Sequence, residues 1–228
     1  MKPLRDWDDL PDFMRTEAVR PYYDNLKKQE TKLYLKRVFD VLAACILLVV
    51  LAPIMFMLSV WIKLDSPGPV FFRQNRITQY GKEFRIIKFR TMVNNADQIG
   101  PVVTVGGDER ITRVGAVIRK YRIDEFPQLF NVLMGDMSFV GTRPEVKKYV
   151  DSYTDEMYAT LLLPAGITNN TSIEFKDEDS YLLNAAKVDE VYLYEILPKK
   201  MYWNLKGIAD FSLLSEWMIM IRTILAVI

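Results

Sequence analysis

Residues 41–62 read VLAACILLVVLAPIMFMLSVWI, a run of 22 residues without a charged side chain. A straight helix of this length would reach roughly 33 Å, enough to cross a bilayer core of about 30 Å. The run begins too far from Met1 for an ordinary signal peptide and lacks a convincing cleavage site. Its length and all-round apolarity favour membrane insertion over the alternative, a buried helix of a soluble domain.

Pro53 lies near the middle of this run, where it removes a backbone donor and clashes with the carbonyl of Val49. Two shapes follow: a kinked helix that crosses the bilayer, or a helix–break–helix that enters and leaves by the same face. Both flanks are basic, with five Lys and Arg residues in 26–40 and three in 63–77. Because Lys and Arg prefer the cytoplasmic side, the charges favour re-entry, with Pro53 at the break of the hairpin.

The overall composition excludes several classes of function. The chain has 228 residues, of which 30 are Lys or Arg and 29 are Asp or Glu. This balance argues against a membrane anchor that carries a nucleic-acid-binding domain, since such binding needs excess positive charge. There is no histidine, and therefore no Ser-His-Asp triad and no His-bearing zinc site. The single thiol, Cys45, lies inside the apolar run and is interpreted as a packing residue.

The chain divides into three segments: a polar, peripheral lead-in with the start of a basic helix (1–35), the membrane hairpin (36–63) and a cytoplasmic domain (64–228). In the third segment, partial alternation over 70–92 predicts two strands that turn near Tyr80. We expect a loop at 94–108 and a loop or short strand at 135–144. Helices are expected at 114–121, 125–134, 145–163, 181–202 and 211–228.

The last of these helices carries only Glu216 and Arg222 as charges, which predicts an interfacial or packing helix. The expected fold class is therefore α+β, mostly helical around a small β-sheet. It includes one N-terminal re-entrant membrane helix-break-helix and amphipathic interfacial helices.

Basic residues gather around the predicted loops and strand ends of the third segment. The planar guanidinium of arginine suits phosphate oxygens, although for any single arginine a solvated surface position is the simpler interpretation. A basic face toward the membrane would equally suit anionic lipid headgroups. The residues are Arg73, Arg76, Lys88, Arg90, Arg110, Arg113, Arg119, Arg122 and Arg143.

Asp124 and Glu125 closely follow the basic stretch RKYR (119–122), and two interpretations of the pair stay open. Asp124 is a natural N-cap, Glu125 suits a first helical turn and Pro127 is tolerated there, which is a complete structural explanation. Alternatively, a helix N-terminus accommodates phosphate, and adjacent carboxylates hold magnesium or supply a nucleophile. With no histidine in the chain, a carboxylate is the first choice for a nucleophile or base.

The order of motifs resembles that of the bacterial sugar transferases known as small monotopic phosphoglycosyl transferases. The resemblance covers about residue 36 to the C-terminus and is specific because many motifs occur in order. The matching stretches are KRVFD (36–40), SPGPVFFRQNR (66–76), FRIIKFRTM (84–92), DERITRVG (108–115), DEFPQLFNV (124–132), GDMSFVG (135–141), GIT (166–168) and a Ser212…Arg222-Thr223 ending.

The resemblance implies a definite reaction in the first membrane step of bacterial glycan assembly, such as that of a capsule, exopolysaccharide, O-antigen or glycoprotein. The family transfers a sugar 1-phosphate from a UDP-sugar to polyprenyl (undecaprenyl) phosphate and releases UMP. By the same mapping, Asp124 is the nucleophile that forms a phosphosugar–aspartyl intermediate, and Glu125 supports it. Asp124 also binds part of a magnesium ion (Mg2+), the expected cofactor. The residues suited to the substrate phosphates are Lys88, Arg90, Arg119 and Arg143.

The resemblance also implies partners and location. UDP-sugar, polyprenyl phosphate and membrane lipid are the expected partners, nucleic acid is not, and a homodimer is among the allowed states. The expected location is the bacterial cytoplasmic (inner) membrane, with the catalytic domain on the cytoplasmic face. The alternative class of function is a membrane-anchored, non-catalytic scaffold that binds nucleotide sugar or lipid. Such a scaffold would keep its function when Asp124 is lost.

The chain departs from the family pattern at several positions. Asn169 and Asn170 follow the Gly-Ile-Thr run, where many members have Gly and an aromatic or apolar residue, and Glu216 replaces a usual Asp. The Asp124-Glu125 pair is intact. The departures therefore weaken the prediction of the sugar, not that of the reaction.

Overall fold

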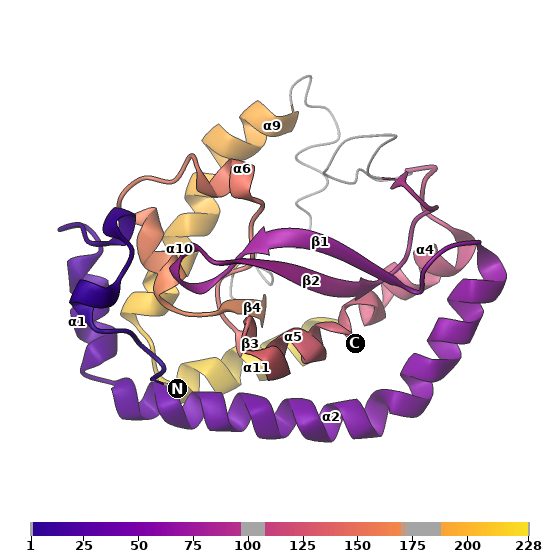
Figure 1. Ribbon diagram of the computed structural model, residues 1–228, viewed down its shortest axis with the longest axis horizontal. Coiled ribbons are helices and arrows are strands. Elements are labelled where there is room, and N and C mark those ends of the chain that lie inside the picture. The colour runs from indigo at the N-terminus through magenta and orange to yellow at the C-terminus, as the bar shows by residue number, and fades with distance from the viewer. Residues whose placement is uncertain (1, 97–107, 170, 172–187, 228) are drawn as a thin grey trace.

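A computed structural model describes residues 2–96, 108–169, 171 and 188–227. Most of the loop expected at 94–108, the first part of the helix expected at 181–202, and Asn170 lie outside the described residues. The described part is mostly helical and contains two small sheets, so the α+β class is confirmed (Figure 1).

Among the described residues, the helices include seven of four to fifteen residues, one of 36 residues and several short turns. The α-helices are α1 (Arg20–Lys27), α2 (Glu30–Asp65), α4 (Arg113–Lys120), α5 (Gln128–Met134), α6 (Lys147–Val150), α9 (Val188–Val191), α10 (Leu197–Ala209) and α11 (Leu213–Val227). The short turns used below are η3 (Gln79–Gly81), η4 (Ile123–Glu125), η5 (Met157–Leu162) and the π-helical turn η6 (Tyr192–Ile196). The helix expected at 145–163 forms only α6 and η5, because Asp, Ser and Thr residues between them are weak helix formers.

The first sheet is the expected antiparallel hairpin of β1 (Phe71–Ile77) and β2 (Glu83–Phe89), which turns at η3. The second sheet pairs β3 (Met137–Val140) with β4 (Ala165–Thr168) in parallel. Strand β3 falls where a loop or short strand was expected, whereas β4 and the pairing were not expected. Four-residue strands carry too little alternation to be recognised, and the partner of a parallel strand is distant in sequence.

Helix α2 is continuous through Pro53, so the break expected at this proline is wrong and the helix bends there instead. Figure 1 shows α2 running beneath the domain and then bending upward toward α4. Pro53 is the proline within it, and the loss of one backbone hydrogen bond there accounts for a bend without ending the helix.

One narrow stripe of α2 packs against the domain, and the rest of its apolar surface is exposed. Residues of the stripe recur every three or four positions and contact β2, α4 and α5. They are Ala44, Leu48, Leu51, Met55, Leu58 and Ile62. On the other side, Ile46, Val49 and Phe56 are 63%, 76% and 70% exposed. The most apolar 18-residue window of α2 is only 17% buried, which contradicts the buried helix of a soluble domain.

The exposed apolar surface continues from α2 onto α11. The rings of Phe39 and Trp217 lie 6.1 Å apart, and Leu214, Ile221 and Leu225 are exposed on α11. Soluble monomers rarely expose an apolar surface of this extent, and such a surface marks a contact with a membrane or a protein partner. The length and exposure of α2 therefore indicate a membrane protein.

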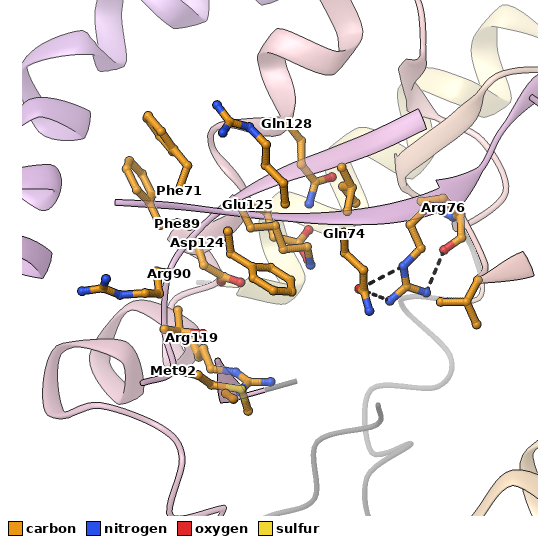
Figure 2. Close-up of a pocket in the computed structure, with 18 of the residues that line it drawn as sticks. Phe71, Gln74, Arg76, Phe89, Arg90, Met92, Arg119, Asp124, Glu125 and Gln128 are labelled. Atoms are coloured by element: carbon orange, nitrogen blue, oxygen red, sulfur yellow. Dashed lines mark hydrogen bonds and ion pairs between the residues drawn. The ribbon is translucent and has the colours of Figure 1, made fainter. Parts of the chain in front are cut away.

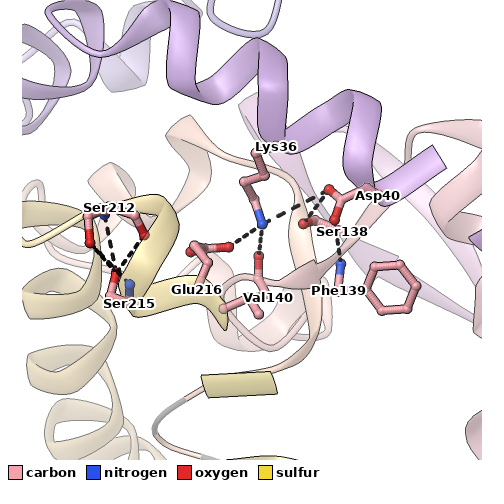
Figure 3. A network of polar contacts seen from close by, with 8 residues as sticks. All are labelled: Lys36, Asp40, Ser138, Phe139, Val140, Ser212, Ser215 and Glu216. Carbon is pink, nitrogen blue, oxygen red and sulfur yellow. Dashed lines mark hydrogen bonds and ion pairs between the residues drawn. The ribbon is translucent and has the colours of Figure 1, made fainter. Parts of the chain in front are cut away.

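Polar contacts fix the N-terminal half of α2 to β3 and α11 (Figure 3). Lys36 donates to the carbonyl of Val140 at 3.0 Å and forms an ion pair with Glu216. Asp40 accepts a 2.8 Å hydrogen bond from the hydroxyl of Ser138. These groups are buried, and each needs its partners because an unpaired charge would be costly there.

Polar contacts also fix the C-terminal end of α2. Arg90 donates to the carbonyls of Ser66 and Pro67 at 2.7 and 3.1 Å, which satisfies groups that a helix end leaves unpaired. The carboxylate of Asp65 accepts from the backbone N–H of Val114 at 3.2 Å, at the start of α4. Both ends of the apolar helix are therefore held by the same domain.

The N-terminal segment corrects a further expectation. It was predicted to be a polar, peripheral lead-in, yet its apolar residues belong to the largest hydrophobic core, together with η5 and α10. Leu4, Met14, Val19 and Leu26 are fully buried there. These residues are separated by charges and prolines without a helical period, so the pattern gave no signal of burial.

We predict that Met14→Ala destabilises the protein by about 2–5 kcal/mol, because it removes buried apolar volume and leaves a cavity. Thermal unfolding of the detergent-purified protein should show a midpoint lower by about 5 °C or more. Glu17→Ala, an exposed change in the same segment, is the matched control and should leave the midpoint unchanged. Equal midpoints for Met14→Ala and the wild type would mean that the segment is peripheral after all.

Candidate active site

A cavity of about 520 Å³ opens beside the β1–β2 hairpin. Its walls come from β1, β2, α4, η4, the start of α5 and the residues that follow β3. Asp124, Glu125, Lys88, Arg119 and Arg143 all line it. Arg90 lines it too, so the structure brings together all six residues predicted to act on substrate. The cavity is large enough for a small-molecule ligand.

The two carboxylates lie on η4, between α4 and α5. Arg122 precedes the turn with φ 52°, a left-handed conformation that is uncommon outside glycine and redirects the chain after α4. Helix α5 begins only at Gln128, and no side chain caps η4 or α5. The interpretation of Asp124 as a plain helix N-cap is therefore wrong. Figure 2 shows both carboxylates close to the cavity instead.

Lys88 supplies the counter-ion of Glu125. Its ammonium nitrogen lies 2.7 Å from the carboxylate of Glu125, and both side chains are largely buried. Burial opposes ionisation of Glu125, but the charges of Lys88 and Arg143 outweigh it and hold the pKa of Glu125 below its usual value. Glu125 is therefore ionised at neutral pH.

Asp124 has the opposite shift. Burial raises the pKa of its carboxyl, and the adjacent charge of Glu125 raises it further, while Lys88 and Arg119 oppose the change. Its neighbour therefore carries the lower pKa of the two. A carboxylate with a raised pKa is more basic than a surface aspartate, which suits a nucleophile or base.

Arg90, the fourth residue predicted to bind phosphate, lines the cavity, but its guanidinium bonds to other partners. Its guanidinium points away from Asp124 in Figure 2 and donates to the C-terminal end of α2. It is 5% exposed, and burial lowers its pKa. In this arrangement Arg90 stabilises the end of the apolar helix instead of meeting a phosphate.

Two neutral side chains in the cavity were missed by the sequence reasoning. Gln128 is 2% exposed and lines the cavity three residues after Glu125, and its carboxamide has no hydrogen bond to any described residue. Gln74 lies on β1 and faces the same space (Figure 2). Neither carries a charge, so neither was among the residues predicted to bind phosphate, although both fall inside the matched motifs.

The carboxylates fit a magnesium ion that arrives with a substrate. Within the described ranges, no group of three or more Asp, Glu, His or Cys residues could form a metal site from protein alone. Asp124 forms no ion pair with a described residue, whereas Glu125 is paired with Lys88. Magnesium commonly binds through one or two carboxylates and completes its shell with phosphate and water. Asp124 is therefore the residue suited to hold it.

Comparison with known proteins gives a consistent result. The family model described as "Bacterial sugar transferase" matches residues 31–228. The UDP-N-acetylgalactosamine-undecaprenyl-phosphate N-acetylgalactosaminephosphotransferase of Aeromonas hydrophila is 50% identical over 135 residues, which is 58% of this chain and 32% of that protein. The UDP-glucose:undecaprenyl-phosphate glucose-1-phosphate transferase of Caulobacter vibrioides is 49% identical over 121 residues, 52% of this chain and 45% of that protein.

A relative of similar length matches over more of the chain. The exopolysaccharide production protein ExoY of Rhizobium meliloti is 31% identical over 207 residues, 84% of each chain. The chain spans less than half the length of the Aeromonas and Caulobacter relatives. The family match covers the apolar helix, the paired carboxylates and the basic cavity. This chain belongs to the bacterial sugar transferase family.

Proposed function

We propose that this chain transfers a sugar 1-phosphate from a UDP-sugar to polyprenyl (undecaprenyl) phosphate, giving polyprenyl diphosphate sugar and UMP. The observation that carries the proposal is an adjacent pair of half-buried carboxylates facing a cation-lined cavity beside an apolar, outward-facing helix. A soluble nucleotide sugar and a lipid phosphate can meet only at such a boundary. The printed names of two relatives include both a UDP-sugar and undecaprenyl phosphate.

The first half-reaction uses Asp124 as the nucleophile. A carboxylate oxygen of Asp124 attacks the β-phosphorus of the UDP-sugar, and the bond from that phosphorus to the oxygen bridging the α- and β-phosphates breaks. UMP leaves with the electron pair of that bond, and the sugar phosphate stays on Asp124 as an acyl phosphate. Lys88, Arg119 and Arg143 offset the negative charge of the diphosphate.

The second half-reaction restores the enzyme. An oxygen of polyprenyl phosphate attacks the same phosphorus, the bond to Asp124 breaks, and polyprenyl diphosphate sugar leaves. Glu125, which Lys88 keeps ionised, is suited to position or deprotonate the incoming phosphate. A magnesium ion held in part by Asp124 would neutralise charge on the diphosphate.

The contacts at both ends of α2 support the re-entrant topology. Residues before α2 share a core with α10, and residues after α2 form β1 of the same domain. A helix that crossed the bilayer would separate these parts by about 30 Å of hydrocarbon. We therefore infer that α2 enters and leaves by one face, the cytoplasmic face of the inner membrane, where UDP-sugars are available.

We predict that enzyme given magnesium and an accepted UDP-sugar, without lipid, releases about one equivalent of UMP and carries a phosphosugar adduct on Asp124. A panel of UDP-sugars with polyprenyl phosphate identifies the accepted donor. Asp124→Asn keeps the shape but removes the anionic nucleophile, so UMP release should fall about a thousandfold or more, with no adduct by mass spectrometry.

Asp136→Asn is the matched control for this test, since Asp136 pairs with Lys82 outside the cavity and should retain turnover. Substantial turnover in Asp124→Asn would favour a ternary complex with direct transfer. If the wild type binds lipid or nucleotide sugar but shows no turnover, the non-catalytic scaffold is favoured.

We predict an acid limb in the pH profile of UMP release that reports Asp124. Because burial raises the pKa of Asp124, the rate should already fall at a pH above that expected for an ordinary aspartate. Lys88 lowers the pKa of Asp124, so Lys88→Gln should move the acid limb to higher pH as well as slow the reaction. An acid limb that stays in place in Lys88→Gln would assign it to another group.

We predict that single cysteines at positions 28 and 82, placed in a Cys45→Ala background, are both protected from an impermeant thiol reagent in intact bacteria. Both positions are exposed on the domain, so both should react once the cells are opened. Labelling of only one position from outside would show that α2 crosses the membrane.

A further inference from the structure

Gln74 faces the cavity from the same side of the hairpin as Lys88. In the antiparallel register, Phe72 lies opposite Lys88 and Gln74 lies opposite Ile86. Residues two apart on a strand share a face, so Gln74 is the diagonal neighbour of Lys88. All four of these residues line the cavity. Gln74 therefore lies on the strand next to Lys88, diagonally across from the residue whose ammonium group pairs with Glu125.

Arg76 fixes the orientation of the Gln74 carboxamide. Its Nε and Nη2 atoms both donate to Oε1 of Gln74, at 3.2 and 2.8 Å (Figure 2). Because a guanidinium only donates, the atom that faces it must be the carbonyl oxygen of the amide. Arg76 is itself held in place, since its Nη1 donates to the carbonyl of Pro144 at 3.3 Å and lies 4.0 Å from Glu145.

The opposite side of the carboxamide is left as a pure donor. With Oε1 bound to Arg76, the Nε2 amide group of Gln74 points away from the guanidinium, and no described residue accepts a hydrogen bond from it. A sugar hydroxyl both donates and accepts, so it matches a donor-only group incompletely. A phosphate oxygen only accepts, and the neighbouring charges of Lys88, Arg119 and Arg143 favour phosphate in this part of the cavity.

We propose that the Nε2 amide of Gln74, oriented by Arg76, donates a hydrogen bond to a diphosphate oxygen of the nucleotide sugar. Gln74 is then a substrate-binding residue, and Arg76 acts on substrate only through it. A neutral donor adds a directed hydrogen bond without a further positive charge that would hold UMP after the first half-reaction. This assignment rests on the proposed function, because it takes UDP-sugar as the donor substrate.

The test compares two substitutions that remove the donor in different ways. Gln74→Glu keeps an oxygen for Arg76 and so preserves the contact that orders the strand, whereas Gln74→Met removes donor and acceptor without adding charge. The matched control is Asn75→Asp, which makes the same change of charge one residue along β1. Asn75 is exposed and does not line the cavity.

The measurement is the Kd for UDP in magnesium buffer, by calorimetry on the 228-residue chain in detergent, together with UMP release. We expect both Gln74 variants to bind UDP about ten- to a hundredfold more weakly than the wild type, the cost of one hydrogen bond to a charged group. Asn75→Asp should bind within about twofold of the wild type. The melting midpoint of Gln74→Glu should match that of the wild type.

Each contrary result has a distinct meaning. If Gln74→Met loses affinity but Gln74→Glu does not, Gln74 serves only to hold Arg76 and the assignment fails. If the wild type releases UMP and all variants bind UDP as tightly as it does, the assignment fails and the proposed function stands. If the wild type neither binds UDP nor releases UMP from any UDP-sugar, both fail.

Discussion

One side of helix α2 packs against the domain while the other side exposes apolar residues, and the arrangement of the domain depends on this division. Its stripe from Ala44 to Ile62 packs against β2, α4 and α5, while residues such as Val49 and Phe56 face outward. A helix in hydrocarbon gains little from apolar contacts alone, since lipid offers the same. The polar contacts of Lys36, Asp65 and Arg90 therefore matter most for holding it to the domain.

The cavity depends on a balance of charges. Two adjacent carboxylates in a partly buried site repel each other, and burial raises the pKa of both. Lys88, at 2.7 Å from Glu125, removes much of that cost for one of them and leaves Asp124 as the more basic carboxylate. The different shifts of two neighbouring groups are what allow them to take different roles.

The sequence predicted the features that depend on local pattern. The apolar helix, the β1–β2 hairpin, α4 and α11 follow from periodicity and turn residues, and the residues of the cavity follow from the ordered motifs. Three features depend on tertiary contacts and were not predictable: the β3–β4 sheet, the burial of Met14 and its neighbours, and the hydrogen-bond partners of Arg90. The bend in place of a break at Pro53 belongs with them, because packing of the stripe keeps α2 helical.

The three consecutive residues Lys88, Phe89 and Arg90 connect helix α2 to the paired carboxylates. The Lys88 side chain holds Glu125 in the cavity, Phe89 packs in the same apolar cluster as Met55 and Ile62, and Arg90 binds the C-terminal end of α2. Asp65 provides a second connection, since it binds the first turn of the helix that leads to Asp124. Through these contacts the position of α2 sets the position of the carboxylates, so under the proposed function a lipid phosphate would reach them at the membrane surface.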